Sequence, residues 1–258
     1  MCFFVFLPTV YYLLSTVIIA PIMISIIVAA YNEEKRILPS LFTIRDYCIT
    51  KNMDHEIIVV DDGSTDNTRR VSMDKIPQIP HLRVVGYDTN MGKGYALRKG
   101  VLSSKGDFVL LTDADLSTPI EELSKLLHLI HNKKCDIAIG SRALSLSEII
   151  KKQPWWRQGM GKFFNKIVKT LIIDDFNDTQ CGFKLFTGDS ARDLFKEARI
   201  NRFAYDVEIL ALAKKNGYRI LEVPIRWVNS PQSKVNPLKD SVQMFFDLLK
   251  IRTSLGKV

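Results

Sequence analysis

The sequence predicts an α/β domain in which helices flank a mainly parallel sheet. Short apolar segments of strand length alternate with segments of helical length, an order typical of parallel strands joined by helical crossovers. Polar residues collect directly after several of these apolar segments, where the ligand-binding edge of an open α/β sheet would lie. The chain of 258 residues is 47% hydrophobic, which is enough to bury a core of this kind.

Each element of this domain can be assigned in order. The segment 22–30 is continuously apolar, as expected of a strand that is covered on both faces. Further strands are predicted at 56–60, 82–87, 107–112 and 136–140, and helices near 34–50, 65–75, 93–104 and 119–133. Thr118 to Glu121 matches a capping box with proline at the first helical position, so we expect a helix to begin there. Residues 113–117 would then form a short turn between a buried strand and a capped helix.

Composition narrows the class of partner. A formal charge of +8 and a pI near 9.2 suit a polyanion such as a phosphate ester, an anionic lipid or a nucleic acid. No base-reading or stacking module is recognisable, so a nucleic acid is not expected. The four cysteines, Cys2, Cys48, Cys135 and Cys181, are scattered without a CxxC pair. This argues against a disulfide framework or a zinc site, and it favours a reducing compartment.

Residues 1–21 form an apolar segment with two interpretations. Met1 to Met23 contains no charged residue, and about 20 apolar residues suffice to span a bilayer, so the segment could be a membrane anchor. Alternatively, the start is assigned too far upstream, because Met23 would open a sensible domain. We therefore expect three parts: the apolar segment, the α/β domain at 22–235 and a C-terminal amphipathic helix at 236–258.

The segment 146–173 combines basic and aromatic residues. Glu148 is its single acid, against the basic residues Lys151, Lys152, Arg157, Lys162, Lys166 and Lys169. Tryptophan and phenylalanine are interleaved with them, and helical spacing would place much of the apolar set on one face. Such a helix suits a membrane interface. The alternative is a helix that packs on the core and exposes a charged face.

Asp113 and Asp115 follow a predicted buried strand at positions i and i+2. Carboxylates so placed on a strand-to-helix turn can face one hard divalent cation. Mg²⁺ or Mn²⁺ usually takes one or two carboxylates together with substrate phosphates. Isolated Asp-x-Asp sequences are mostly solvated turns or helix caps, but the end of a buried strand favours a metal site.

Two further polar motifs lie after strands. In the pair Asp61-Asp62, one carboxylate could bind a nucleobase or ribose. The run from Asn90 to Gly94 is glycine-rich, and its backbone N–H groups with Lys93 could approach a phosphate. It lacks the full phosphate-loop spacing. No Gly-x-Gly-x-x-Gly follows the first strand, which argues against a dinucleotide oxidoreductase.

Three motifs, Val28 to Glu34, Val59 to Asp66 and Thr112 to Asp115, together resemble the family 2 glycosyltransferases in order and spacing. The resemblance implies the Rossmann-like GT-A fold, a nucleotide-sugar donor and a Mg²⁺ or Mn²⁺ cofactor. By this resemblance Asp113 and Asp115 would hold the metal. The donor would be bound by Ala29, Tyr31, Glu33, Asp61, Asp62, Lys93, Asp113 and Ala114.

A second set of motifs narrows the resemblance. Asp178 to Phe186, Phe203 to Glu208, and Ser233-Lys234 resemble the dolichyl-phosphate glucosyltransferases and their polyprenyl-phosphate relatives. This implies an inverting hexosyltransferase, favouring UDP-glucose as donor and a polyprenyl or dolichyl phosphate as acceptor. It would be membrane-associated, with its active site on the cytosolic side. The anionic groups would be contacted by Arg142, Gln180, Lys184 and Lys234.

Two points remain open: the third ligand of the metal and the sugar that is transferred. Related mannosyltransferases use GDP-mannose, and they often carry glutamine two residues after the second metal aspartate. Ser117 stands at that position here, so the third protein ligand is undetermined and water could replace it.

The acceptor decides which residues catalyse. The expected catalytic set is Asp113, Asp115, Arg142, Lys184 and Asp206. A phosphate monoester is already anionic, with a second pKa of roughly 6, and needs little general base. A glycan or protein hydroxyl would need one, and the candidates are Asp206, Asp178 and Glu208. The alternative interpretation makes Asp206 and Glu208 helix-surface acids and Lys184 an ordinary surface lysine. A non-catalytic nucleotide- or membrane-binding protein would leave both aspartate pairs unexplained.

Overall fold

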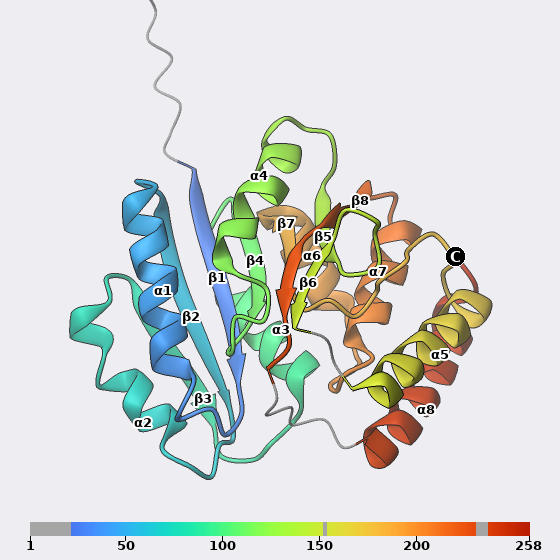
Figure 1. Cartoon of the computed structure of the whole chain (residues 1–258), viewed down its shortest axis with the longest axis horizontal. Helices are drawn as coiled ribbons and strands as arrows, with labels where there is room; N and C mark the ends of the chain where they lie inside the picture. Colours follow the sequence, from blue (N-terminus) through green and yellow to red (C-terminus); the bar gives the residue numbers. More distant parts are fainter. Residues whose placement is uncertain (1–21, 152–153, 231–236) are drawn as a thin grey trace, which may run out of the picture.

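The computed structural model describes residues 22–151, 154–230 and 237–258 (Figure 1). Its main sheet has seven strands in the order β3-β2-β1-β4-β7-β5-β8, and β6 and β9 form a separate pair. The strands are β1 (Met23–Ala30), β2 (Asp54–Asp62), β3 (Leu82–Tyr87), β4 (Phe108–Asp113), β5 (Ile137–Ser141), β6 (Glu148–Lys151), β7 (Lys184–Thr187), β8 (Ile220–Pro224) and β9 (Arg226–Val228). The predicted α/β class and the five predicted strands are confirmed.

Helices cover both faces of the main sheet. They are α1 (Ile37–Thr50), α2 (Thr68–Met73), α3 (Lys93–Ser103), α4 (Leu123–His131), α5 (Trp155–Leu171), α6 (Gly188–Glu197), α7 (Tyr205–Lys215) and α8 (Pro237–Leu255), with short 3-10 turns η1 (Ile76–Gln78) and η2 (Ile120–Glu122). On β1, Ile26 and Val28 join the core beneath α1 and α4. The intervening Ile27 joins the core beneath α3, α6 and α7. This alternation explains why the strand is apolar at every position.

The strand order creates a switch point between β1 and β4. The chain passes from β1 to β2 and β3 on one side, and then returns so that β4 pairs with the other side of β1, all in parallel. Helical connections on opposite faces diverge there and leave a crevice at the carboxyl ends of the strands, where ligands bind in open α/β sheets. β7 runs antiparallel between β4 and β5, and it brings the segment after Asp178 into the centre of the sheet.

The capping box predicted at Thr118 is wrong. Pro119 has an extended backbone (φ −57°, ψ 142°) and no side chain caps the turn that follows. After Pro119 the chain first forms the 3-10 turn η2, and α4 begins only at Leu123. The acid of the predicted box, Glu121, is exposed. The next residue, Glu122, is buried and pairs with Arg226 at 2.7 Å and Lys125 at 2.6 Å.

The segment 146–173 forms β6 and α5, and α5 lies beside α8 (Figure 1). Near the end of α5, Val168 is fully buried, whereas Trp155 and Phe163 are 83% and 68% exposed. α8 similarly buries Met244 and Leu248. Among the helices of the described residues, none combines the length and the hydrophobicity needed to cross a bilayer. The apolar segment 1–21 lies outside the described residues.

Candidate active site

Asp113 and Asp115 lie at the carboxyl end of β4, next to the end of β1. Asp113 is in register with Ala29, so the loops after both strands meet at the switch point. Leu116 has a φ of 45°, a left-handed conformation that is costly for a branched side chain. Its N–H donates to the Asp113 carbonyl at 3.1 Å, which closes a tight turn. The predicted turn is therefore confirmed, and it presents both carboxylates at one edge.

Gly182 makes room for the Asp113 carboxylate. A Cβ at position 182 would lie only 2.5 Å from Asp113 Oδ2 and 2.8 Å from the carboxyl carbon. The glycine is thus required by close approach, because any side chain would push Asp113 out of position. Gly182 therefore shapes the site, because it leaves the space that the Asp113 carboxylate fills.

Lys93, the first residue of α3, is the direct partner of Asp113. Its Nζ donates to Asp113 Oδ1 at 2.5 Å. Burial opposes ionisation of Asp113, but the charges of Lys93 and Lys184 outweigh it and hold its pKa below the ordinary value. Burial also opposes the charge on Lys93, yet Asp113 and Asp206 raise its pKa. Both groups are therefore charged at neutral pH.

Asp62 organises the loop that carries Lys93. Its buried carboxylate accepts from Tyr87 Oη at 2.7 Å, Asn90 Nδ2 at 2.9 Å, Met91 N at 2.8 Å and Gly92 N at 3.0 Å. Burial outweighs these bonds and raises the pKa of Asp62. The Met91 and Gly92 N–H groups donate to Asp62, so these two groups of the glycine-rich run already have an acceptor. Phosphate binding by this run through Lys93 stays a prediction.

Asp61 faces a different neighbour. It is fully buried, and Arg69 Nε donates to its Oδ2 at 3.0 Å. Successive residues of a strand point to opposite faces, so Asp61 and Asp62 cannot serve one ligand from the same side. Donor binding by either aspartate stays a prediction.

Arg36 links three loops around the switch point. Its Nε and Nη2 donate to Glu33 at 2.6 and 2.5 Å, and its Nη1 lies 3.2 Å from Asp115 Oδ2 and 2.6 Å from Ser230 Oγ. Sequence reasoning missed this arginine. The i, i+3 spacing from Glu33 was the available signal, because side chains three residues apart at a helix start are neighbours. Tyr31, an expected donor ligand, is partly exposed in the same loop.

Arg142 and Asp178 form a second ion pair near the same edge. Arg142 Nε and Nη2 bind the Asp178 carboxylate at 2.6 and 2.8 Å, and the Arg142 backbone N–H adds a bond of 3.0 Å. Burial opposes ionisation of Asp178, but Arg142 outweighs it and lowers the pKa. The guanidinium also lies 5.5 Å from the centre of the Trp227 ring. Arg142 is thus rigidly placed and remains 29% exposed.

Lys184 and Asp206 form a buried ion pair behind this edge. They are 1% and 4% exposed, and the Lys184 ammonium also donates to the Cys181 carbonyl. Burial raises the pKa of Asp206 although Lys184 opposes this. The interpretation of Lys184 as surface charge, and of Asp206 and Glu208 as helix-surface acids, is wrong. Glu208 is buried and accepts from the backbone N–H groups at 199 and 200.

The remaining expected acceptor residues are less informative. Gln180 is partly buried, and its N–H donates to Asp178 Oδ1 at 3.2 Å. Lys234 lies outside the described residues, so its role stays a prediction. Cys181 is a buried free thiol, as expected of a small packing residue.

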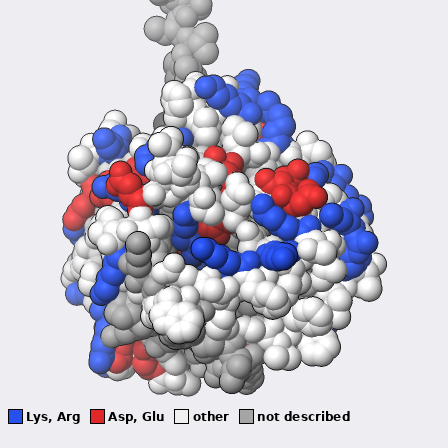
Figure 2. Space-filling view, turned by 45° about the vertical axis from the view of Figure 1, so that its right-hand side comes forward, with Lys and Arg blue, Asp and Glu red and all other residues white. Residues whose placement is uncertain are grey.

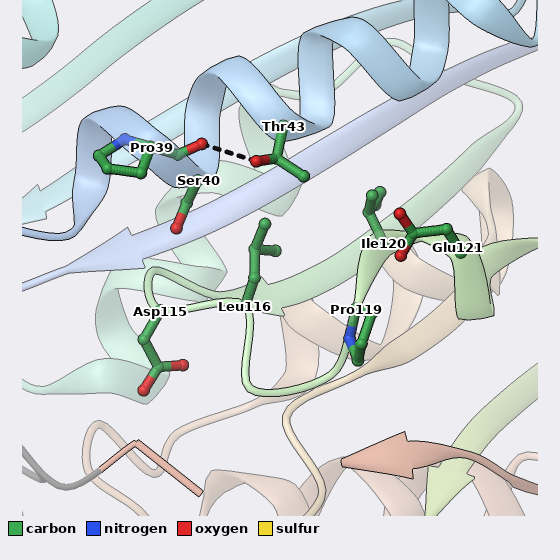
Figure 3. Close-up of a pocket in the computed structure, with 8 residues that line it drawn as sticks. All are labelled: Pro39, Ser40, Thr43, Asp115, Leu116, Pro119, Ile120 and Glu121. Atoms are coloured by element: carbon green, nitrogen blue, oxygen red, sulfur yellow. Dashed lines mark hydrogen bonds between the residues drawn. The ribbon is translucent and has the colours of Figure 1, made fainter. Parts of the chain in front are cut away.

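The carboxylate pair suits a hard divalent cation. Within the described chain, no hydrogen bond reaches Asp113 Oδ2, and no cluster of three or more His, Cys, Asp or Glu residues could hold a metal. Two carboxylates with diphosphate oxygens would be a sufficient set for Mg²⁺ or Mn²⁺. A hollow of about 380 Å³ adjoins Asp115, between Pro39 and Ser40 of α1 and the turn at Leu116 (Figure 3).

Comparisons with known proteins agree with this geometry. A family model described as "Glycosyl transferase family 2" matches residues 25–195. "Dolichyl-phosphate beta-glucosyltransferase" of Dictyostelium discoideum is 36% identical over 242 residues, covering 90% of this chain and 74% of that protein. The protein of the same name from Homo sapiens is 34% identical over 241 residues, covering 89% and 74%.

A solved structure shows the same fold. Glucosyl-3-phosphoglycerate synthase from Mycobacterium tuberculosis, in complex with Mn²⁺, uridine-diphosphate and glucosyl-3-phosphoglycerate, has a TM-score of 0.68 at 18% identity, covering 93% of this chain and 82% of that one. The predicted GT-A architecture is confirmed. With its carboxylate pair at the switch point, the chain belongs to glycosyl transferase family 2.

Proposed function

We propose that this protein transfers glucose from UDP-glucose to a polyprenyl or dolichyl phosphate, with inversion at the sugar. The observation that carries the proposal is the set of paired charges at the switch point, where Asp113 and Asp115 lie among Lys93, Arg36 and Arg142. The identity of about a third to relatives named dolichyl-phosphate beta-glucosyltransferase supports the choice of sugar and acceptor.

The charged residues at the switch point have two roles in the proposed reaction. Asp113 and Asp115 would hold Mg²⁺ or Mn²⁺, which supplies charge neutralisation for the departing diphosphate. Lys93 and Arg142 are both accessible and cationic, so they would orient the anionic groups of donor and acceptor. Preorganised charges of this kind stabilise negative charge that develops on a leaving group.

The state of the nearby acids favours a phosphate acceptor over a hydroxyl. Asp178 is bound by Arg142 through two side-chain contacts, and Asp206 is buried against Lys184. A general base must be able to reach and accept the proton of the acceptor. An acceptor phosphate is already anionic near neutral pH and makes no such demand. An Asp206→Asn variant with full activity would further disfavour a hydroxyl acceptor activated by Asp206.

Incubation of the full chain with radiolabelled UDP-glucose, dolichyl phosphate and Mg²⁺ is expected to give an organic-extractable glucolipid. GDP-mannose in the same assay is expected to give at least about tenfold less product. A site that hydrogen-bonds one nucleotide disfavours another, because the other nucleotide leaves polar groups of the site without partners. A panel in which no nucleotide sugar yields a lipid product would refute the proposal. Product formed mainly from GDP-mannose would keep the acceptor and change the donor.

A membrane surface is the proposed location of the acceptor. Large apolar side chains are exposed on α5, on α8 and on the segment 146–150 that precedes α5. They are Leu146, Ile150, Trp155, Met160, Phe163, Val242, Phe245, Phe246 and Leu249. Exposed lysines lie among them, including Lys162 and Lys166. Figure 2, with this side turned forward, shows a broad uncharged area in the lower half, bordered by Lys and Arg residues. Such a surface fits the headgroup region of an anionic bilayer. Orientation toward the cytosol stays a prediction.

Replacing Phe163 and Phe246, which are 68% and 55% exposed, in a Phe163→Ser/Phe246→Ser variant is expected to weaken binding to phosphatidylserine-containing vesicles by about tenfold or more, because burial of each ring is lost. Co-sedimentation measures the bound fraction. An Ile49→Ser/Met73→Ser variant is the matched control, since these side chains are 58% and 51% exposed on α1 and α2. Equal losses in both variants would contradict an interface at α5 and α8.

A further inference from the structure

The acids around the switch point are already neutralised by side chains. Each of five carboxylates contacts a cationic group, and Arg36 serves two of them. The pairs are Glu33 and Asp115 with Arg36, Asp113 with Lys93, Asp178 with Arg142, and Asp206 with Lys184. A divalent cation entering this site alone would therefore meet a region that is close to charge balance.

Arg36 is held against Asp115 by a rigid contact. Glu33 binds its Nε and Nη2 as a fork, which fixes the plane of the guanidinium and leaves Nη1 directed at Asp115. The side chain is only 19% exposed. A cation bound to Asp115 Oδ2 would consequently have a fixed positive charge beside it, which disfavours binding.

Lys93 occupies the other carboxylate, but with more freedom. Its Nζ lies 2.5 Å from Asp113 Oδ1, on a flexible stem that is 25% exposed. An ammonium is a compact charge that can turn to a nearby phosphate without a fixed plane. Binding of a metal at Asp113 would release this contact, and a diphosphate would give Lys93 a new anionic partner.

We infer that Arg36 and Lys93 are counterions that occupy the metal carboxylates until a nucleotide diphosphate arrives, so that the divalent cation and the diphosphate bind together. The inference rests on the proposed metal role of Asp113 and Asp115. A diphosphate supplies the negative charge that the metal, Arg36 and Lys93 all require. By linkage, the nucleotide then strengthens metal binding by the same factor as the metal strengthens nucleotide binding.

The test measures Mn²⁺ retained by the full chain in equilibrium dialysis, with and without UDP. For the unaltered protein, UDP is expected to tighten Mn²⁺ binding by about 5- to 150-fold, the usual range of coupling between sites. Arg36→Gln is expected to tighten binding of Mn²⁺ alone by about tenfold, because one opposing charge is removed. The gain from UDP should shrink accordingly in that variant.

Two further variants separate charge from structure. Arg36→Lys keeps a positive charge and should retain weak binding of Mn²⁺ alone. Arg45→Gln removes a charge from α1, the helix that Arg36 precedes, where Arg45 pairs with Asp46, and should change neither affinity. Thermal unfolding of each variant confirms that it is folded.

The outcomes are distinct. Equal Mn²⁺ affinity with and without UDP, or an Arg36→Gln variant that binds Mn²⁺ alone no more tightly, overturns the inference and leaves the proposed transfer reaction standing. If the folded protein retains no Mn²⁺ even with UDP, the proposed metal site is refuted, and the inference is refuted with it. An Arg45→Gln variant that matches Arg36→Gln would also overturn it, because net charge alone would then explain the effect.

Discussion

Replacing both carboxylates, in the Asp113→Asn/Asp115→Asn variant, is expected to reduce glucosyl transfer by at least about 10³-fold while the protein remains folded. A metal held at a departing diphosphate contributes several kcal/mol, and each ~1.4 kcal/mol changes the rate tenfold. Asparagine keeps the shape of each side chain, so Gly182 still accommodates position 113. Activity is measured with UDP-glucose and dolichyl phosphate across a Mg²⁺ titration, and folding by circular dichroism.

The control for this variant is Asp189→Asn. Asp189 is 96% exposed, and it follows Thr187, which pairs with Phe108 at the end of β4 opposite to Asp113. Its activity should stay within about twofold of the unaltered protein, as expected of a surface substitution that touches no site. Retained activity with unchanged Mg²⁺ dependence in the double variant would eliminate the central role given to Asp113 and Asp115.

The strand ends of the first half were predictable because their signal is local. Asp113 follows a continuous apolar segment, and parallel strands bring their carboxyl ends to one edge whatever the loops between them do. The position of the carboxylate pair therefore followed from pattern alone. The capping box at Thr118 failed because Pro119 stands at the cap position with an extended backbone, and proline has no side-chain oxygen to bind the N–H groups of the first turn. The neighbouring Glu122 binds Arg226, which lies 104 residues away in the sequence, and no local pattern reveals that contact.

The second half of the site depends on pairings over long distances. β7 enters the sheet antiparallel between β4 and β5, and this register places Gly182 against Asp113 and Lys184 against Asp206. The motif from Asp178 to Phe186 was found by its resemblance to a known family. Its position in the fold, with Gly182 beside Asp113, could not be predicted from the sequence. Arg36 is a similar case, because its contact with Ser230 joins residues 194 positions apart.

A single substitution of the buried lysine, Lys184→Met, is expected to destabilise the protein by about 3–5 kcal/mol, since it leaves Asp206 buried without its cation. The double variant Lys184→Met/Asp206→Leu should recover most of that loss, because apolar residues of similar volume often replace a buried ion pair at little cost. Urea unfolding of the three proteins measures the free energies.

The pH dependence gives an independent check of the same pair. Burial already raises the pKa of Asp206, and loss of Lys184 removes the charge that most opposes this rise. Folded Lys184→Met would then keep a proton on Asp206 that the unfolded chain releases above its ordinary pKa of about 3.9. Because the folded state binds more protons, the stability of the single variant should fall as pH rises from about 4 to its raised pKa. The double variant lacks the titrating group and should not show this additional slope. A single variant as stable as the double at every pH would mean that water or a rearranged neighbour compensates Asp206, and that Lys184 is not needed to bury this acid.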